Sequence, residues 1–255
     1  MLRRELRRIA TAATFLTRLP LVARYASGDP QELARSVRWF PLVGAGVACL
    51  GAAVLHLALG PLPIGIAAAL ALAAMVAITG AFHEDGFVDA ADGLFGGMTP
   101  ARRLEIMKDS RIGTFGGAAL MLMLLLRWQA LIALPLAHLL SALVAAHALG
   151  RAATPILALC LPYVREGASN KPVAEGVRGG DLAIALLVAS ALGAPLLMAL
   201  GLGGSLTLLL VGALVLVALG TLYWRKIGGI TGDCLGAATQ TLEIVILLVA
   251  IAWLR

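Results

Sequence analysis

The sequence predicts an all-α fold: a polytopic integral membrane helix bundle of about seven transmembrane helices, with an N-terminal amphipathic helix at the membrane interface. Composition is one reason, because 60% of the 255 residues are hydrophobic and only 13% are charged. A soluble domain carries charge on about a quarter of its residues. The apolar runs are the other reason, since they are continuous rather than alternating, which excludes a transmembrane β-barrel. We expect residues 1–255 to form a single membrane-embedded domain.

The N-terminal segment, residues 1–39, is predicted to lie in the cytoplasm and at the membrane interface. It begins with four arginines in eight residues, as the charged region of a signal peptide does. Further arginines from Arg18 to Arg38 interrupt it before any long apolar run, so a cleaved signal is not expected. Residues 2–19 instead have the pattern of an amphipathic helix that lies on the membrane surface.

The apolar stretches approach or reach the roughly 20 residues that a spanning helix needs. Arg127 interrupts the run from 113 to 160, and we interpret this run as two spans with a tight turn near Pro135. A single long helix is the alternative. The predicted spans are residues 40–60, 63–82, 113–133, 137–160, 182–200, 204–223 and 237–254.

The distribution of positive charge predicts the orientation. With these spans, every Lys and Arg except Arg127 and Arg255 falls at one face of the membrane. The positive-inside rule makes that face cytoplasmic. We therefore expect a multi-pass protein of a bacterial inner membrane, with its polar loops and its active site facing the cytoplasm. The net charge of +6 follows from this bias, and without a basic domain carrying interleaved aromatics no nucleic-acid partner is expected.

The stretch between residues 83 and 93 is acidic in a chain that is otherwise apolar. Asp85, Asp89 and Asp92 stand at i, i+4 and i+7, which places them on one face of a helix. Like charges stacked in this way repel, and the repulsion disappears when a divalent cation lies among them. Oxygen-only ligands favour a hard ion such as Mg²⁺. The alternative is an ordinary solvated loop between two spans.

We expect residues 83–112 to form an acidic catalytic loop in which these three aspartates are catalytic residues and metal ligands. Glu84 and Asp109 are further ligand candidates, and His83 is a candidate for orienting a carboxylate or moving a proton. Carboxylates for a metal, followed by cations for phosphate oxygens, indicate phosphoryl transfer. The candidate cations of this segment are Arg102, Arg103, Lys108 and Arg111.

Two later loops add candidates for substrate contacts. The loop over residues 161–181 is rich in glycine and mixed in charge, and it is either a mobile lid or a solvated linker. In the loop over residues 224–236, Asp233 either binds substrate or caps the last helix. The candidates for phosphate contacts in the first loop are Arg165, Lys171 and Arg178.

Residues 83–97 and 102–116 together resemble the signature of the cobalamin synthase family, the adenosylcobinamide-GDP ribazoletransferases. Residues 15–20 resemble that family's N-terminal motif and residues 228–237 its C-terminal motif, so the resemblance spans essentially the whole chain. It implies a membrane transferase that joins adenosylcobinamide-GDP to α-ribazole or α-ribazole 5′-phosphate, late in cobalamin biosynthesis. GMP leaves, adenosylcobalamin or its 5′-phosphate forms, and Mg²⁺ is the implied cofactor.

The hypothesis for the mechanism follows from this resemblance. Asp85, Asp89, Asp92 and Asp109 hold one or two Mg²⁺ ions at the cytoplasmic membrane surface, and the nearby cations contact phosphate. An aspartate or His83 accepts the proton of the acceptor hydroxyl. The sequence leaves open whether the protein, embedded in its lipid bilayer, forms a homo-oligomer.

Two other functions are kept as alternatives. A CDP-alcohol phosphotransferase of phospholipid synthesis performs the same type of reaction, and Asp89-x-x-Asp92-Gly93 is comparable to part of its Asp-rich signature. The later Asp-x-x-x-Asp of that family is not reproduced, because Gly113 stands where a second Asp after Asp109 would be. The other alternative is a cation transporter that uses the same acidic cluster, and the placement of these acids in a cytoplasmic loop argues against it.

Overall fold

The computed structural model describes residues 2–165 and 171–255, leaving aside the side chains of Leu21, Lys171 and Pro172. Over these residues the chain forms helices and no β-strand, which confirms the predicted all-α class. The N-terminal part contains α1 (Leu2–Leu16), α2 (Pro20–Ala23), α3 (Pro30–Ser36) and the 3-10 turn η1 (Val37–Trp39). The later helices are α4 (Phe40–Ala58), α5 (Ile64–Thr79), α6 (Phe82–Gly96), α7 (Pro100–Ile106), α8 (Thr114–Ala133), α9 (Leu136–Arg151), α10 (Ala153–Cys160), α11 (Lys171–Glu175), α12 (Gly179–Ile227) and α13 (Gly232–Leu254).

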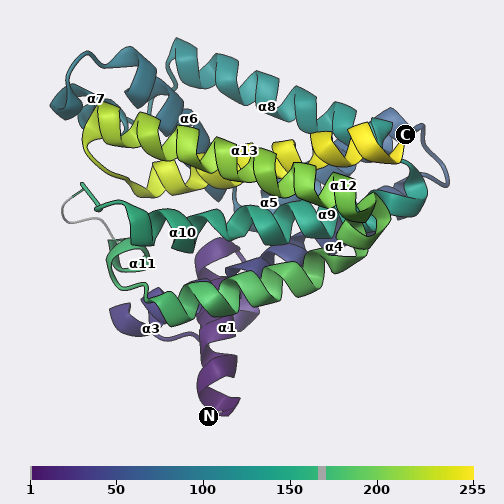
Figure 1. Cartoon of the computed structure of the whole chain (residues 1–255), viewed down its shortest axis with the longest axis horizontal. Coiled ribbons are helices and arrows are strands. Elements are labelled where there is room, and N and C mark those ends of the chain that lie inside the picture. The colour runs from purple at the N-terminus through teal and green to yellow at the C-terminus, as the bar shows by residue number, and fades with distance from the viewer. Residues whose placement is uncertain (1, 166–170) are drawn as a thin grey trace.

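Five stretches of helix in the described ranges are long and apolar enough to cross a membrane, or six if α5 and α6 count as one bent span. The spans predicted at 182–200 and 204–223 are the two legs of α12. This helix reverses at Gly201, whose φ of 66° and ψ of −174° are open to glycine and not to other residues, and Figure 1 shows the two legs running side by side. The predicted positions therefore match helices, while the number of seven spans stays a prediction.

The connections of the long helices gather at the two ends of the bundle (Figure 1). One end carries α3, α7, α11 and the segment between α12 and α13. The other end carries the α4–α5 and α8–α9 links, the reversal of α12 and the C-terminus. This arrangement agrees with the prediction that the polar loops lie at one end of the bundle and the short links at the other. The break at Pro135 between α8 and α9 confirms two helices in the run interrupted by Arg127.

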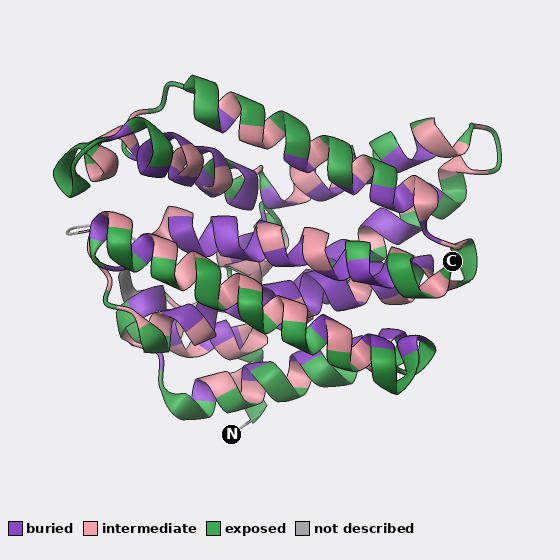
Figure 2. Ribbon diagram, turned by 45° about the horizontal axis from the view of Figure 1, so that its top comes forward, coloured by how far each residue is buried: buried purple, intermediate pink, exposed green. Residues whose placement is uncertain are grey.

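The apolar core has two main parts along the bundle. In the part near the short links, small residues of α4, α5 and α9 allow close packing around Leu55, Leu143 and Leu247. In the part near the polar end, Leu94, Leu157 and other side chains of α6, α10 and α13 pack together. Figure 2 shows buried residues concentrated in the central helices, and exposed residues along the outer helices α8 and α12, where lipid would lie.

The segment predicted as a loop over residues 83–112 is largely helical, which corrects the predicted boundary at residue 82. α5 ends at Thr79, the next residues Gly80 and Ala81 both have positive φ, and the chain bends by 88° into α6. α6 then packs between α8 and α13. Because the acidic residues lie on a helix held on two sides, they are placed more rigidly than loop residues would be.

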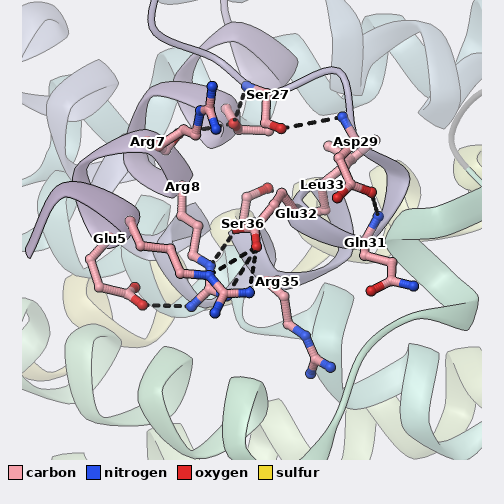
Figure 3. Close-up of polar contacts among 12 residues, drawn as sticks. Glu5, Arg7, Arg8, Ser27, Asp29, Gln31, Glu32, Leu33, Arg35 and Ser36 are labelled. Atoms are coloured by element: carbon pink, nitrogen blue, oxygen red, sulfur yellow. Dashed lines mark hydrogen bonds and ion pairs between the residues drawn. The ribbon is translucent and has the colours of Figure 1, made fainter. Parts of the chain in front are cut away.

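The predicted interfacial helix is present as α1 and ends at Leu16 rather than at residue 19. It lies across the direction of the long helices (Figure 1), and Leu2 and Leu6 near its start are exposed. An ion-pair network that the sequence did not predict joins α1 to α3, η1 and α12, and Figure 3 shows the part around Arg8 and Glu32. We call it the interfacial network; its members are Arg4, Glu5, Arg8, Glu32, Arg35, Arg38 and Asp181.

Candidate active site

The candidate site is built on the contact between α6 and α13 at the polar end of the bundle. Gly86 of α6 lies against the main chain of α13, and a Cβ atom added to it would lie 3.1 Å from the Cα atom of Asp233. Gly236 of α13 is similarly close, with an added Cβ 3.4 Å from the carbonyl oxygen of His83. No side chain separates the two helices here, so the carboxylates that flank the contact come close to one another.

Three carboxylates flank this contact. Asp85 is exposed, Asp89 is half-buried, and 13% of the Asp233 side chain is exposed. The negative charges of Asp233, Asp85 and, more weakly, Asp92 act on the Asp89 carboxyl group, and the positive charge of Arg165 opposes them. The structure therefore brings together two of the predicted metal ligands, Asp85 and Asp89, and adds Asp233 from the other helix.

Arg165 connects this group to the loop before it. Its Nη2 atom donates hydrogen bonds to Asp233 Oδ2 at 2.7 Å and to the carbonyl oxygen of Met107 at 3.1 Å. A parallel bridge between Tyr163 and Ile230 fixes the main chain beside it. Arg165 is thus held at the site by the end of α7 and by α13, and its predicted phosphate contact stays a prediction.

Asp233 does not cap the last helix. The N-cap of α13 is Thr231, whose hydroxyl oxygen accepts a hydrogen bond from the Cys234 N–H at 3.3 Å. The capping interpretation of Asp233 is wrong, and its carboxylate is directed to Arg165 instead.

Asp92 is turned toward α8. Its Oδ2 accepts a hydrogen bond from the Gly113 N–H at 2.7 Å, and its Oδ1 accepts one from the Gly116 N–H at 2.8 Å. These amides belong to the N-terminus of α8, where a negative charge is stabilised by the helix dipole and by otherwise unpaired donors. Asp92 therefore caps α8 from another helix, and its role as a metal ligand stays a prediction.

The remaining charges of the segment form local pairs on the surface. Arg111 donates to Asp109 Oδ2 at 2.6 Å, and these hydrogen bonds lower the pKa of the exposed Asp109 carboxyl to about 2. Arg102 pairs with Glu105 at 2.7 Å, and Lys108 is exposed. Asp109 is therefore paired with Arg111 and does not join the group of carboxylates on α6.

The Arg103 side chain binds main-chain carbonyl oxygens of two helix ends. Its guanidinium donates to the carbonyl oxygens of Gly97, Met98 and Lys226 at 2.9, 3.2 and 2.7 Å. It thus joins the end of α6 to the end of α12, and its donors are occupied.

Arg178 lies at the start of α12 beside α3. It lines a hollow together with Arg35, away from the carboxylates of α6. Lys171 has no described side chain.

His83 and Glu84 point into the protein interior. His83 is 5% exposed and lines a cavity of about 30 Å³ with Phe15, Phe40 and Phe82. Glu84 is 7% exposed, and its Oε1 accepts hydrogen bonds from Arg127 at 3.1 Å and from Gln240 at 3.0 Å. Neither side chain shares the surroundings of Asp89.

The residues present suit a magnesium ion in their chemistry. Asp85, Asp89 and Asp233 offer only oxygen ligands, and their mutual repulsion is of the kind that a divalent cation relieves. In the described parts of the chain, no three His, Cys, Asp or Glu side chains are arranged to hold a metal ion by themselves. Mg²⁺ typically takes one or two carboxylates and completes its shell with water and substrate phosphates, so two of these aspartates suffice.

Sequence reasoning missed how the buried charges are partnered. Arg127, which interrupts an apolar run in the sequence, pairs with Glu243 inside the bundle at 3.3 Å. Gln240 and Arg151 complete this group and were not singled out. A helical projection could have found them, because Gln240 and Glu243 lie one turn apart on α13.

Comparison with known proteins places the chain among transferases. A family model described as cobalamin-5-phosphate synthase matches residues 8–251. A protein of Bradyrhizobium diazoefficiens named adenosylcobinamide-GDP ribazoletransferase is 45% identical over 95% of this chain and 92% of its own. Relatives with the same name from Ralstonia pickettii and Ralstonia nicotianae are 44% and 42% identical over 99% of this chain, covering 98% and 97% of theirs. No solved structure matches the chain.

Proposed function

The chain belongs to the cobalamin-5-phosphate synthase family and is an enzyme of cobalamin synthesis, and from this premise we propose its reaction. It transfers the adenosylcobinamide-phosphate group of adenosylcobinamide-GDP to α-ribazole or α-ribazole 5′-phosphate. GMP is released, and adenosylcobalamin or its 5′-phosphate is formed. The shared name of its curated relatives supports this choice of substrates.

The bond changes define what the site must do. A ribose hydroxyl oxygen of the acceptor attacks the phosphorus that carries the cobinamide and forms a new P–O bond. The bridging P–O bond to GMP breaks, its electron pair leaves on the GMP phosphate, and the hydroxyl proton passes to a base. In such reactions the protein contributes positioning and electrostatic stabilisation rather than covalent chemistry.

We assign the role of base to Asp89. It is half-buried and so can reach a bound hydroxyl, and it is coupled to the charges of Asp85 and Asp233 on either side of the helix contact. His83 is the weaker candidate because it lies among phenylalanine rings in the interior. Arg165, held by Asp233 and Met107, is placed to contact the pyrophosphate, and the exposed Arg102, Lys108 and Arg111 lie on the same connection between α6 and α8.

Asp85 and Asp89 would hold Mg²⁺, while Asp233 would hold Arg165 beside them. When bound, the ion neutralises negative charge on the pyrophosphate and on the departing GMP. We place the site at the cytoplasmic face of a bacterial inner membrane, because a GDP-linked substrate is supplied there and the basic loops lie at the same end. The observation that carries the proposal is the meeting of these three carboxylates with Arg165 where α6 touches α13.

The test is a transfer assay on the purified protein in detergent. Adenosylcobinamide-GDP, α-ribazole and Mg²⁺ are supplied, and GMP release is followed. We expect release that requires both substrates and stops with EDTA, and a loss of more than about 100-fold in kcat for Asp89→Asn, as for a removed catalytic base. A folded protein that releases no GMP would overturn the proposal, and a fully active Asp89→Asn variant would overturn the assignment of the base.

A further inference from the structure

A second cluster of charged side chains lies inside the bundle, next to the candidate site but separate from it. We call it the core network; it is distributed over α6, α8, α9 and α13, and its members are Glu84, Arg127, His147, Arg151, Gln240 and Glu243. All six residues are at most 7% exposed. Buried ionisable groups in a membrane bundle are costly, and such groups commonly serve a function.

Arg127 of α8 connects the two helices that carry the candidate site. Its Nη1 donates to Glu84 Oε1 of α6 at 3.1 Å and to Gln240 Oε1 of α13 at 2.8 Å. Gln240 in turn donates to Glu84 Oε1 at 3.0 Å, which closes a triangle of hydrogen bonds. Glu84 is adjacent to Asp85 in sequence, and Gln240 lies two turns after Asp233 on α13.

The contact between α6 and α13 combines a main-chain contact near the candidate site with packing of apolar side chains such as Leu94 and Leu242. At Gly86 and Gly236 the two main chains touch with no side chain interlocked between them. Apolar packing and close main-chain contact have little directional preference, whereas hydrogen bonds to a planar guanidinium are directional. The triangle around Arg127 therefore adds directional contacts to those that set how far along α13 the carboxylates of α6 lie.

We propose that Arg127, Glu84 and Gln240 are positioning residues, which hold α6 against α13 so that Asp85 and Asp89 face Asp233. This inference rests on the proposed reaction. It assigns Glu84 to the core network rather than to the metal, since its Oε1 is directed to Arg127 and Gln240. Side chains of consecutive helix residues point about 100° apart, which is why Glu84 faces the interior while Asp85 is exposed.

The experiment exchanges the carboxylate and the amide across Arg127. The variants are Glu84→Gln, Gln240→Glu and the double variant carrying both, in the full-length protein. Glu84→Gln should lower kcat at least tenfold with KM changed less than threefold. The double variant restores one carboxylate and one amide to the triangle, and kcat should return to within threefold of the parent. A folded double variant as inactive as Glu84→Gln would show that the Glu84 carboxylate itself is required, which overturns the proposal.

Asp181→Asn is the matched control. It makes the same change of carboxylate to amide in a buried ion-paired residue, but in the interfacial network, which does not join α6 to α13. We expect its kcat per folded molecule to stay within twofold of the parent. A loss of kcat in this control equal to that of Glu84→Gln would indicate general loosening and would overturn the proposal.

Two further measurements keep the outcome clear. Arg127→Lys keeps the charge but not the planar fork, and its kcat per folded molecule should fall at least tenfold; a parent-like kcat would overturn the positioning role. The rate of hydrogen exchange of the α6 amides, which is measured without substrate, should rise in Glu84→Gln and not in Asp181→Asn. An unchanged rate in Glu84→Gln would also overturn the positioning role.

The parent protein is assayed first. Absence of GMP release by the parent counts against the proposed reaction, and the exchange experiment still tests the positioning role.

Discussion

The core network and the interfacial network solve similar problems in different surroundings. Each joins several helices through arginines and carboxylates. In the core network the exposed fractions of the paired side chains are 2–9%, while in the interfacial network Arg4 is 67% exposed and Glu5 24%. Asp181 and Arg8 are exceptions, since the Asp181 side chain is fully buried between Arg35 and Arg38 and the Arg8 side chain is 7% exposed. The two networks thus differ in their access to water.

This difference decides what each ion pair is worth. A charge that loses its partner in the interior cannot be solvated, so breaking a buried pair is strongly destabilising. A charge that loses its partner near the surface regains water, and the pair contributes little. The core network therefore contributes strongly to the stability of the packing of α6, α8, α9 and α13. The interfacial network contributes less to the attachment of α1 and α3 to the bundle.

The largest loss of stability is expected for Glu243→Gln. Glu243 lies within 3.3 Å of Arg127, 2.8 Å of Arg151 and 3.2 Å of His147. The amide leaves two buried arginines with only Glu84 as a carboxylate, which costs about 3–5 kcal/mol. Thermal unfolding in detergent measures this, with Glu5→Gln of the interfacial network as the control. A midpoint equal to that of the control would contradict the comparison.

A smaller loss is expected for Asp181→Asn. The carboxylate accepts from Arg35 at 2.8 Å and from Arg38, and it also accepts from the Arg178 N–H at 3.0 Å. Removing the charge weakens hydrogen bonds worth about 1.5–3 kcal/mol in total, because both arginines are 14–15% exposed and can turn toward water. The same unfolding experiment measures it, and a loss larger than that of Glu243→Gln would reverse the order of the two networks.

The sequence marks one member of the core network, Arg127, as a charge inside an apolar run, and it gives no such sign of the interfacial network. A charge inside an apolar run such as Arg127 is conspicuous, and the rule that it must be paired within the bundle holds without knowledge of the fold. Its partners come from α6 and α13, which the sequence separates by more than 100 residues, so only the packing identifies them. Asp181 and Arg38 lie in polar segments where a charge needs no explanation, and nothing in the pattern shows that they meet.

The same reasoning explains what the sequence predicted of the candidate site. The spacing of Asp85 and Asp89 on one helix face depends only on helix geometry, and the structure brings these two together. Asp92 follows the same spacing, but the N-terminus of α8 takes its carboxylate, and that contact is tertiary. The role of Asp233 depended on which residue caps α13, and the choice of Thr231 could not be read from composition.

A still smaller loss of stability is expected for Arg4→Gln, and its dependence on salt distinguishes the interfacial network from the core network. Arg4 pairs with Glu32 at 2.8 Å while 67% of its side chain is exposed. Arg4→Gln should cost about 0–1 kcal/mol at low salt and nothing at 1 M NaCl, because mobile ions screen exposed charges. The measurement is the difference in unfolding midpoint between parent and variant at the two salt concentrations. For Glu243→Gln the difference should persist at high salt, and its disappearance there would show that water reaches the core network.

The smallest effect on stability is expected for Asp109→Asn, in a pair that belongs to neither network. Arg111 and Asp109 are neighbours on the connection between α7 and α8, and the low pKa of Asp109, about 2, reflects mainly that local pair, with a smaller effect of the Arg102 charge. A lowered carboxyl pKa stabilises the folded state above about pH 4, but both groups are solvated, so the unfolding midpoint of the variant should lie only slightly below that of the parent there and should approach it as the pH falls toward 2. The variant therefore tests the predicted metal role of Asp109 without a change in folding. A higher Mg²⁺ concentration for half-maximal GMP release would support that role, and an unchanged one would leave the ion to the carboxylates between α6 and α13.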